Sequence, residues 1–146
     1  PREKYKRGYG MAEMPASEKC FQLSSKILAL YEDAGERASA HRMLGMLVEQ
    51  TSDLGAAVIA LNYLPMPEMR REHAVTLVKC AQKVIYNLNL ARRERLFDDG
   101  SLSEALSLAV SVASDIVVTV SDICGVPAPV KSAGPMPDGF DLPYKK

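Results

Sequence analysis

Apolar residues recur every three or four positions along most of the chain, which is the spacing of one face of an α-helix. The clearest stripe lies in the segment from about 37 to 63, and its members are Leu44, Leu47, Thr51, Leu54, Val58 and Leu61. No segment alternates as a half-buried strand does. The β-branched run 116–120 favours a strand by composition, but the helical stripe on both sides of it predicts a helix.

Three further segments carry stripes of the same spacing. The first runs from Pro15 or Ser17 to Ala34, and its predicted buried face is Phe21, Ser24, Leu28 and Tyr31, with Ile27 beside it. The third runs from Pro67 to about Phe97, with a face of Ala74, Leu77, Val78, Ala81, Val84, Ile85 and Leu88. The fourth runs from 101 to 124, with a face of Leu102, Ala105, Ala109, Val112, Ile116, Val120 and Ile123.

Helix-ending and helix-starting residues mark the boundaries between these segments. Gly35 ends the first helix, Pro65 and Pro67 separate the second from the third, and the sequence 98–100, Asp-Asp-Gly, ends the third. Ser101 and Glu104 have the spacing of a capping box at the start of the fourth helix. Gly125 is placed to end that helix in a left-handed conformation.

The loops between the four helices are short, so each helix must run antiparallel to the one before it. The predicted fold is therefore all-α, an antiparallel up-down-up-down four-helix bundle over residues 15–124. Residues 1–14 form a basic N-terminal arm with two tyrosines, which either solubilises the chain or contacts nucleic acid. Residues 125–146 contain five prolines and three glycines and form an extended tail.

Two helices carry more apolar surface than one core face needs. The fourth adds Leu106, Leu108, Val110, Val117 and Val118, and the second adds Met43, Met46, Ile59, Gly55, Ala56, Ala57 and Ala60. A second apolar face on a bundle is typical of a subunit contact, which predicts a homo-oligomer. The other interpretation is a wide core face on which small residues let helices approach closely.

Composition adds little about partners. The chain has 146 residues, and its 18 basic residues balance its 18 acidic ones. Three widely spaced cysteines favour buried free thiols in a reducing compartment over a disulfide framework. With no run of 18 apolar residues and no leader-like segment near its start, the chain is expected to be cytoplasmic, without a membrane span. It begins with Pro1 rather than Met, so we expect further residues before it.

Sequence patterns of catalysis are missing from the chain. It contains no phosphate-binding glycine loop, no nucleophile motif, no Cys-x-x-Cys and no His-Glu-x-x-His. His41 and His73 each lack the glutamate three residues earlier that a two-metal bundle needs. We therefore expect a protein that is not an enzyme and that uses no cofactor or metal.

Charge is distributed unevenly between the last two helices. The third helix has seven basic and three acidic residues, whereas the fourth has three acidic residues and no basic one. At 100° per residue, Lys79, Lys83, Tyr86, Leu90 and Arg93 share an arc away from the core face. The candidate nucleic-acid-binding residues are Arg70, Arg71, Lys79, Lys83, Tyr86, Arg92, Arg93 and Arg95.

The other interpretation of these charges is structural. Acidic residues near the start of the third helix and basic residues near its end complement the helix dipole. Arg70 and Arg71 lie in the first turn, where the dipole disfavours them, so this interpretation does not account for those two.

The helix order, the motif Leu44-x-x-Leu47-Val48-Glu49-Gln50 and a charged third helix followed by Asp99-Gly100-Ser101-Leu102 resemble a family of small four-helix proteins. These are the proteins encoded in intervening sequences of 23S rRNA genes and the related accessory variability determinant of diversity-generating retroelements. The resemblance covers about residues 17–124. It implies ring-shaped pentamers and, for the retroelement members, association with a reverse transcriptase and nucleic-acid binding through basic surfaces. The neutral charge and the proline-rich tail differ from that family.

The sequence thus predicts a non-enzymatic, oligomeric accessory protein that associates with RNA or DNA, or with an enzyme that processes them, through a basic face of the third helix. The alternative is a structural or adaptor protein whose terminal arms bind protein neighbours without nucleic acid.

Overall fold

The computed structural model describes residues 15–61 and 63–125, and these residues contain helices but no strand. Their elements are α2 (Pro15–Ala29), α3 (Tyr31–Ala34), α4 (Ala38–Leu61), α5 (Pro67–Arg93) and α6 (Asp99–Cys124). The all-α fold class is confirmed. The predicted N-terminal arm and all of the predicted C-terminal tail except Gly125 lie outside the described residues.

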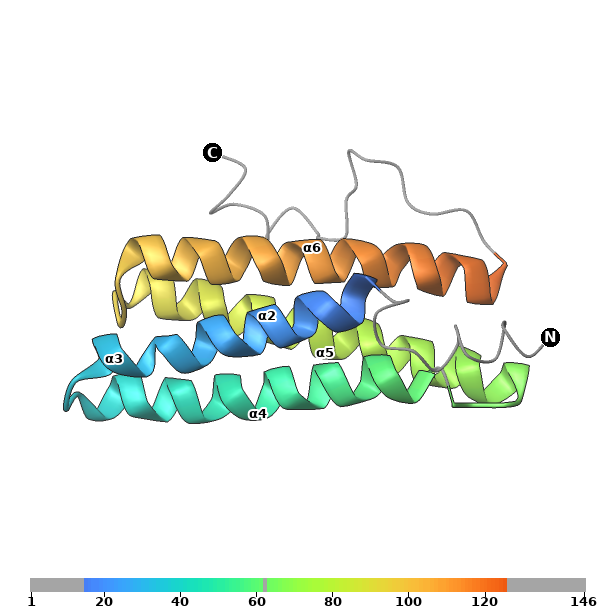
Figure 1. The fold of residues 1–146 in the computed structure, drawn as a ribbon, viewed down its shortest axis with the longest axis horizontal. Coiled ribbons are helices and arrows are strands. Elements are labelled where there is room, and N and C mark those ends of the chain that lie inside the picture. The colour runs from blue at the N-terminus through green and yellow to red at the C-terminus, as the bar shows by residue number, and fades with distance from the viewer. Residues whose placement is uncertain (1–14, 62, 126–146) are drawn as a thin grey trace.

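The four long helices lie side by side along one axis, with α3 continuing α2 at one end (Figure 1). Helix α2 packs against α4 and α6, and α5 packs against the same two helices, so α2 and α5 lie diagonally opposite each other. Each long helix therefore has an inward side towards a shared core and an outward side. This order of contacts is compatible with the predicted up-down-up-down topology.

Two ion pairs between α2 and α6 join residues whose order along α6 is the reverse of their order along α2. Lys19 of α2 pairs with Asp115 of α6, whereas Lys26, further along α2, pairs with Glu104, which lies earlier in α6. At one end of the molecule, the Arg37 guanidinium donates hydrogen bonds to the carbonyls of Asp33 and Leu96. Arg37 thus ties the loop before α4 to the loop before α6.

The predicted core faces of the last three long helices are largely confirmed. All six residues of the α4 stripe are buried, including Leu54 near the middle of the helix. In α5 only Val78 is partly exposed, and in α6 only Val120 and Ile123 are; all three still pack against the core. Leu106, one of the extra apolar residues of α6, is buried as well, and Leu108 and Val110 are partly buried against the core. Much of the apolar excess of α6 thus belongs to a wide core face.

The predicted buried face of the first helix is wrong by one position. Its buried residues are Ala16, Cys20, Leu23, Ile27, Leu30 and Ala34, whereas Phe21, Leu28 and Tyr31 are exposed. Both sets step by three and four, so spacing alone could not separate them. Leu30 interrupts the helix by donating to Ile27 three residues back, and Gly35 ends it as predicted, at a φ of 56°.

The boundary between α5 and α6 also differs from the prediction. Helix α5 ends at Arg93 because Arg95 adopts a left-handed φ of 55°. The Arg95 N–H donates to Arg92 and the Leu96 N–H donates to Ala91, which together form a Schellman motif. The helix therefore ends before the Asp-Asp-Gly sequence that was expected to end it.

The predicted capping box at Ser101 is replaced by a cap one turn earlier. The Asp98 carboxylate accepts a hydrogen bond of 3.0 Å from the Ser101 N–H, so α6 starts at Asp99. Asp98 is thus the N-cap and Ser101 lies in the first turn. At the other end of α6, Gly125 has a left-handed φ of 71° and its N–H donates to Ser121, as predicted.

Two helices, α4 and the stretch Asp99–Ile123 of α6, are long and apolar enough to cross a membrane. The core helices of water-soluble bundles pass the same test, and here the main apolar stripe of each helix packs against the other helices. The predicted cytoplasmic location stays a prediction.

Candidate nucleic-acid interface

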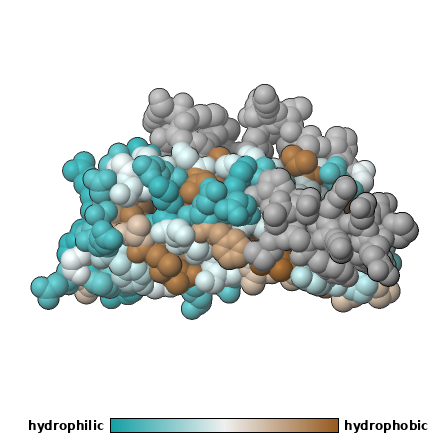
Figure 2. All heavy atoms as spheres, viewed as in Figure 1, coloured by the Kyte–Doolittle hydropathy of each residue, from teal (hydrophilic) through white to brown (hydrophobic). Residues whose placement is uncertain are grey.

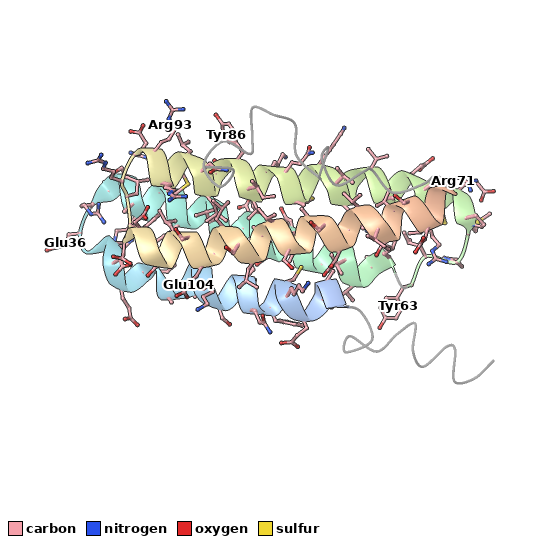
Figure 3. All side chains as sticks on the ribbon, turned by 90° about the horizontal axis from the view of Figure 1, so that it is seen from above. Glu36, Tyr63, Arg71, Tyr86, Arg93 and Glu104 are labelled. Carbon is pink, nitrogen blue, oxygen red and sulfur yellow. The ribbon has the colours of Figure 1, made fainter. Side chains whose placement is uncertain are left out.

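The outward side of α5 carries the centre of the predicted interface. Lys79, Lys83, Tyr86 and Arg93 are exposed, and the Tyr86 side chain is 54% accessible. Figure 3 shows Tyr86 and Arg93 projecting from the same side of the helix, away from the bundle. The inward side of the same helix is filled by residues such as Leu77, Val84 and Leu88, so the basic side chains have no place in the core.

These outward cations form a line along the helix. Lys79 and Lys83 are one turn apart, about 6 Å along the axis, and Arg93 lies about 21 Å beyond Lys79. Among the described residues, no hydrogen bond or ion pair engages the side chains of Lys79, Lys83 or Arg93. We name Lys79, Lys83, Tyr86 and Arg93 the α5 basic face.

The structure does not bring all eight predicted residues together. Arg70 and Arg71 are exposed in the first turn of α5, about 35 Å along the axis from the Arg93 end. Figure 3 places Arg71 and Arg93 at opposite ends of the molecule. A ligand short enough to cover only the α5 basic face would leave Arg70 and Arg71 unused.

Arg92 and Arg95 differ from the α5 basic face in geometry. The Arg92 guanidinium is half-buried and donates to the Asp99 carboxylate at 3.1 Å, which links the end of α5 to the start of α6. Arg95 is exposed in the left-handed turn after the helix. Arg92 is therefore a structural contact, and Arg95 extends the basic surface into the loop.

The outward face of α5 is acidic at its start. Glu72 and Glu68 are exposed on the same side of the helix as Lys79, about two and three turns closer to its N-terminus. A polyanion would be repelled there and attracted from Lys79 onward. Cations therefore line this side of the helix from Lys79 onward, whereas near its start the exposed Arg70 and Arg71 lie beside the two glutamates.

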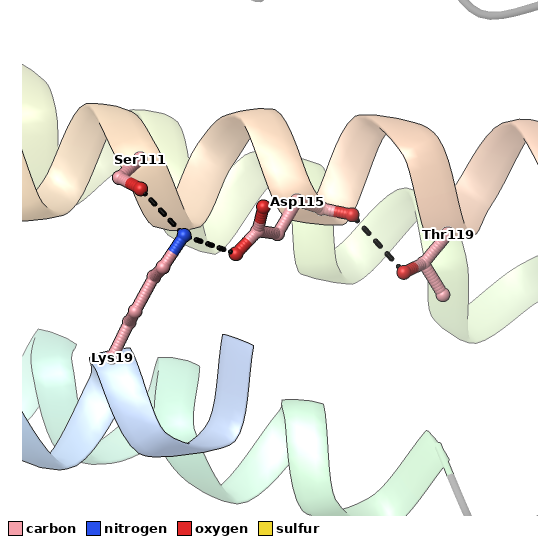
Figure 4. Close-up of polar contacts among 4 residues, drawn as sticks. All are labelled: Lys19, Ser111, Asp115 and Thr119. Atoms are coloured by element: carbon pink, nitrogen blue, oxygen red, sulfur yellow. Dashed lines mark hydrogen bonds and ion pairs between the residues drawn. The ribbon is translucent and has the colours of Figure 1, made fainter. Parts of the chain in front are cut away.

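A polar network fixes α2 on α6 and was not predicted (Figure 4). The Lys19 ammonium donates to the Ser111 hydroxyl at 2.7 Å and to the Asp115 carboxylate at 2.8 Å. The Thr119 hydroxyl donates to the backbone carbonyl of Asp115. Because Lys19 and Asp115 are 96 positions apart, no local sequence pattern could pair them.

The two histidines have structural partners. The His41 Nε2 atom lies 2.7 Å from the Gly35 carbonyl oxygen, and the His73 Nε2 atom lies 2.7 Å from that of Ala57. Within 15–61 and 63–125, no group of three His, Cys, Asp or Glu side chains could hold a metal ion.

The thiols of Cys20 and Cys80 are free, and the side chain of Cys124 is not described. Burial, with a smaller contribution from Asp115, raises the pKa of the Cys20 thiol to about 11. Burial and Asp53 also raise the pKa of Cys80, while Lys83 lowers it by less. Because the thiolate is the reactive form, both groups are poor nucleophiles at neutral pH.

Comparison of the chain with protein-family models, with curated proteins and with solved structures gave no match. The resemblance to the intervening-sequence and retroelement proteins therefore stays a prediction.

Proposed function

We propose that the protein is a non-enzymatic, oligomeric accessory protein, built as an antiparallel up-down-up-down four-helix bundle, that binds RNA or DNA through the α5 basic face. Two observations support the bundle topology. The ion pairs between α2 and α6 connect later residues of α2 to earlier residues of α6, and the Arg37 hydrogen bonds join two loops at one end of the molecule. An enzyme partner that processes nucleic acid is implied only by the family resemblance.

The observation that carries the binding proposal is the line of cations around an exposed aromatic ring. Lys79, Lys83 and Arg93 are accessible on one side of a straight helix, without a charged partner among the described residues. Cations at this spacing attract a phosphate backbone, and Tyr86 offers a surface on which an unpaired base can stack. A single strand fits this arrangement better than a duplex because its bases are free to reach the ring.

The test is fluorescence anisotropy with a labelled 12-nucleotide single-stranded RNA in about 50 mM salt. The double variant Lys79→Ala/Lys83→Ala should bind at least tenfold more weakly than wild type. The control Lys26→Ala/Arg42→Ala removes the same charge from exposed positions on α2 and α4 and should bind within about twofold of wild type.

Three outcomes decide the proposal. Equal losses in the two double variants would mean that only net charge matters and would contradict the assignment to α5. A wild-type protein that binds no RNA or DNA at 50 mM salt would overturn the proposal and favour the adaptor function. A duplex that binds better than the single strand would exclude stacking on Tyr86.

A further inference from the structure

The outward side of α2, together with the first residue of α3, carries an apolar stripe that the core does not use. Phe21, Leu28 and Tyr31 expose 51%, 55% and 40% of their surface, although each is large and hydrophobic. Ser24 and Ser25 lie between Phe21 and Leu28 and are small. We name Phe21, Leu28 and Tyr31 the α2 stripe.

The part of α4 next to α2 carries small residues. Gly55 faces α2, since a Cβ there would lie 3.7 Å from Cys20. On the solvent side of this contact α4 presents Gly45, Ser52 and Ala56, all accessible, and a Cβ at Gly45 would meet nothing within 4 Å. At the end near α3, the Tyr31 ring lies 5.9 Å from the His41 ring.

Figure 2 shows this side of the molecule. Brown and white surface extends over the region of α2 and α4, and teal surface gathers at the end where α3 lies and beside α6 (Figure 2). The α2 stripe has no cation that could bind a nucleic acid, whereas an apolar protein surface would match its side chains.

The α2 stripe is complementary to a second copy of itself. Phe21 and Leu28 are seven residues, or about 10.5 Å, apart on either side of the two serines. In an antiparallel pair of α2 helices, Phe21 of each copy would face Leu28 of the other, and the serines would allow close approach at the crossing point. A two-fold axis satisfies both contacts at once, as in most homodimers.

The size of the surface fits a reversible contact. The 20 residues of 15–34 extend about 30 Å, and the α2–α4 face is about 20 Å wide, so about 600 Å² would be buried on each copy. This total of about 1,200 Å² is at the lower limit of specific interfaces. Glu18 and Glu32 flank the stripe, and their repulsion across the contact would weaken it further at low salt.

We propose that the α2 stripe is the contact between two copies of this chain, packed antiparallel across a two-fold axis that passes near Ser24 and Ser25. The inference deepens the proposed oligomeric state by naming its face and does not depend on nucleic-acid binding. It also differs from the sequence-based expectation, which placed the subunit contact on the second and fourth helices.

The first test is sedimentation velocity of the full chain between about 1 and 500 µM. Wild type should shift from monomer to dimer across this range, and Leu28→Glu should stay monomeric throughout. Val118→Glu is the matched control, because Val118 on α6 is 53% exposed and lies outside the stripe. Its dimerisation should equal that of wild type, and circular dichroism should show the same helix content in all three proteins.

A wild-type protein that is monomeric at 500 µM overturns the proposal. A wild-type oligomer that Leu28→Glu leaves intact also overturns it, while leaving the proposed oligomeric accessory function standing. Loss of RNA binding in the α5 double variant with unchanged dimerisation would show that the two surfaces act separately.

A second test addresses the antiparallel arrangement. In a background with Cys80 and Cys124 replaced by serine, Ser25→Cys should form a disulfide-linked dimer on oxidation with diamide, because the two copies of residue 25 lie near the axis. Ser107→Cys, exposed on α6, should stay monomeric on a non-reducing gel. Equal cross-linking of the two variants would exclude this arrangement.

Discussion

The outward sides of α2 and α5 lie diagonally across the same bundle and have opposite chemistry. The α2 stripe is apolar and lies beside an uncharged strip of α4, whereas the α5 basic face presents three cations and one aromatic ring. The inward sides of the two helices are alike, with Leu23 and Ile27 in α2 and Leu77 and Leu88 in α5, all buried.

This difference separates what specifies the fold from what selects a partner. Leucine, isoleucine and valine at three- and four-residue spacing place each helix in the bundle, whichever residues lie on its other side. The outward residues are free of that requirement. Their chemistry is the basis of the two proposals, an apolar contact at α2 and an electrostatic contact at α5.

The largest expected effect tests whether the α2 stripe faces outward. Ile27 is fully buried and the adjacent Leu28 is 55% exposed. Ile27→Ala should lower the free energy of unfolding by about 2 to 5 kcal/mol, because it removes packed methyl groups and leaves a cavity. Leu28→Ala should change it by about 0.5 kcal/mol or less. Urea unfolding at a low, fixed protein concentration measures both without a contribution from dimer formation.

Equal losses in these two variants would mean that α2 is rotated from the orientation described, and the α2 stripe would then be part of the core.

Much of the fold, but only part of the candidate sites, could be predicted from the sequence. The α4 stripe was easier to predict because polar residues such as Glu49, Ser52 and Asp53 occupy much of its other side. Residues 16–34 of α2 and α3 carry two apolar stripes of the same spacing, and the large side chains of Phe21 and Tyr31 favoured the stripe that proved to be exposed. Cys20 is buried and lies against α4 at Gly55, where a Cβ would be 3.7 Å away; spacing within one helix does not encode such a contact between helices.

The candidate interface likewise has a part that the sequence could predict and a part that it could not. Outward placement of Lys79, Lys83 and Arg93 follows from helical spacing alone. The pairing of Arg92 with Asp99 depends on where α5 ends, and that boundary is set by the left-handed turn at Arg95.

The two faces should respond oppositely to salt. Three phosphate contacts to a single strand give a slope of about −2 for the logarithm of affinity against the logarithm of salt concentration, so RNA binding should weaken about 16-fold between 50 and 200 mM. Dimer formation through the α2 stripe should stay constant or tighten over this range, since salt screens the repulsion between Glu18 and Glu32. Anisotropy and sedimentation at the same salt steps measure the two responses. Parallel weakening would show that both contacts are electrostatic.

A smaller effect concerns the turn that positions the end of the α5 basic face. Asp98→Ala removes the carboxylate that accepts from the Ser101 N–H and should cost about 1 kcal/mol in unfolding free energy. Ser101→Ala should cost less, about 0.5 kcal/mol or below, because the Ser101 side chain is not the cap. Urea unfolding distinguishes the two caps. A larger loss from Ser101→Ala would restore the capping box predicted from the sequence.

The smallest effect concerns Arg95, just beyond the α5 basic face. It tests whether an arginine at this position lowers the stability of the protein relative to glycine. Arg95 has a positive φ of 55° at the position of a Schellman motif where glycine is preferred, and a side chain there is strained. Arg95→Gly should therefore raise the free energy of unfolding by about 0.5 to 1 kcal/mol. Arg93→Gly is the matched control: it removes the same charge from the last helical residue of α5, and it should destabilise the protein by a similar amount because glycine is unfavourable in a helix. If Arg95→Gly gains stability and loses RNA affinity, the basic surface continues into the loop. If it gains stability with no change in affinity, the interface ends at Arg93.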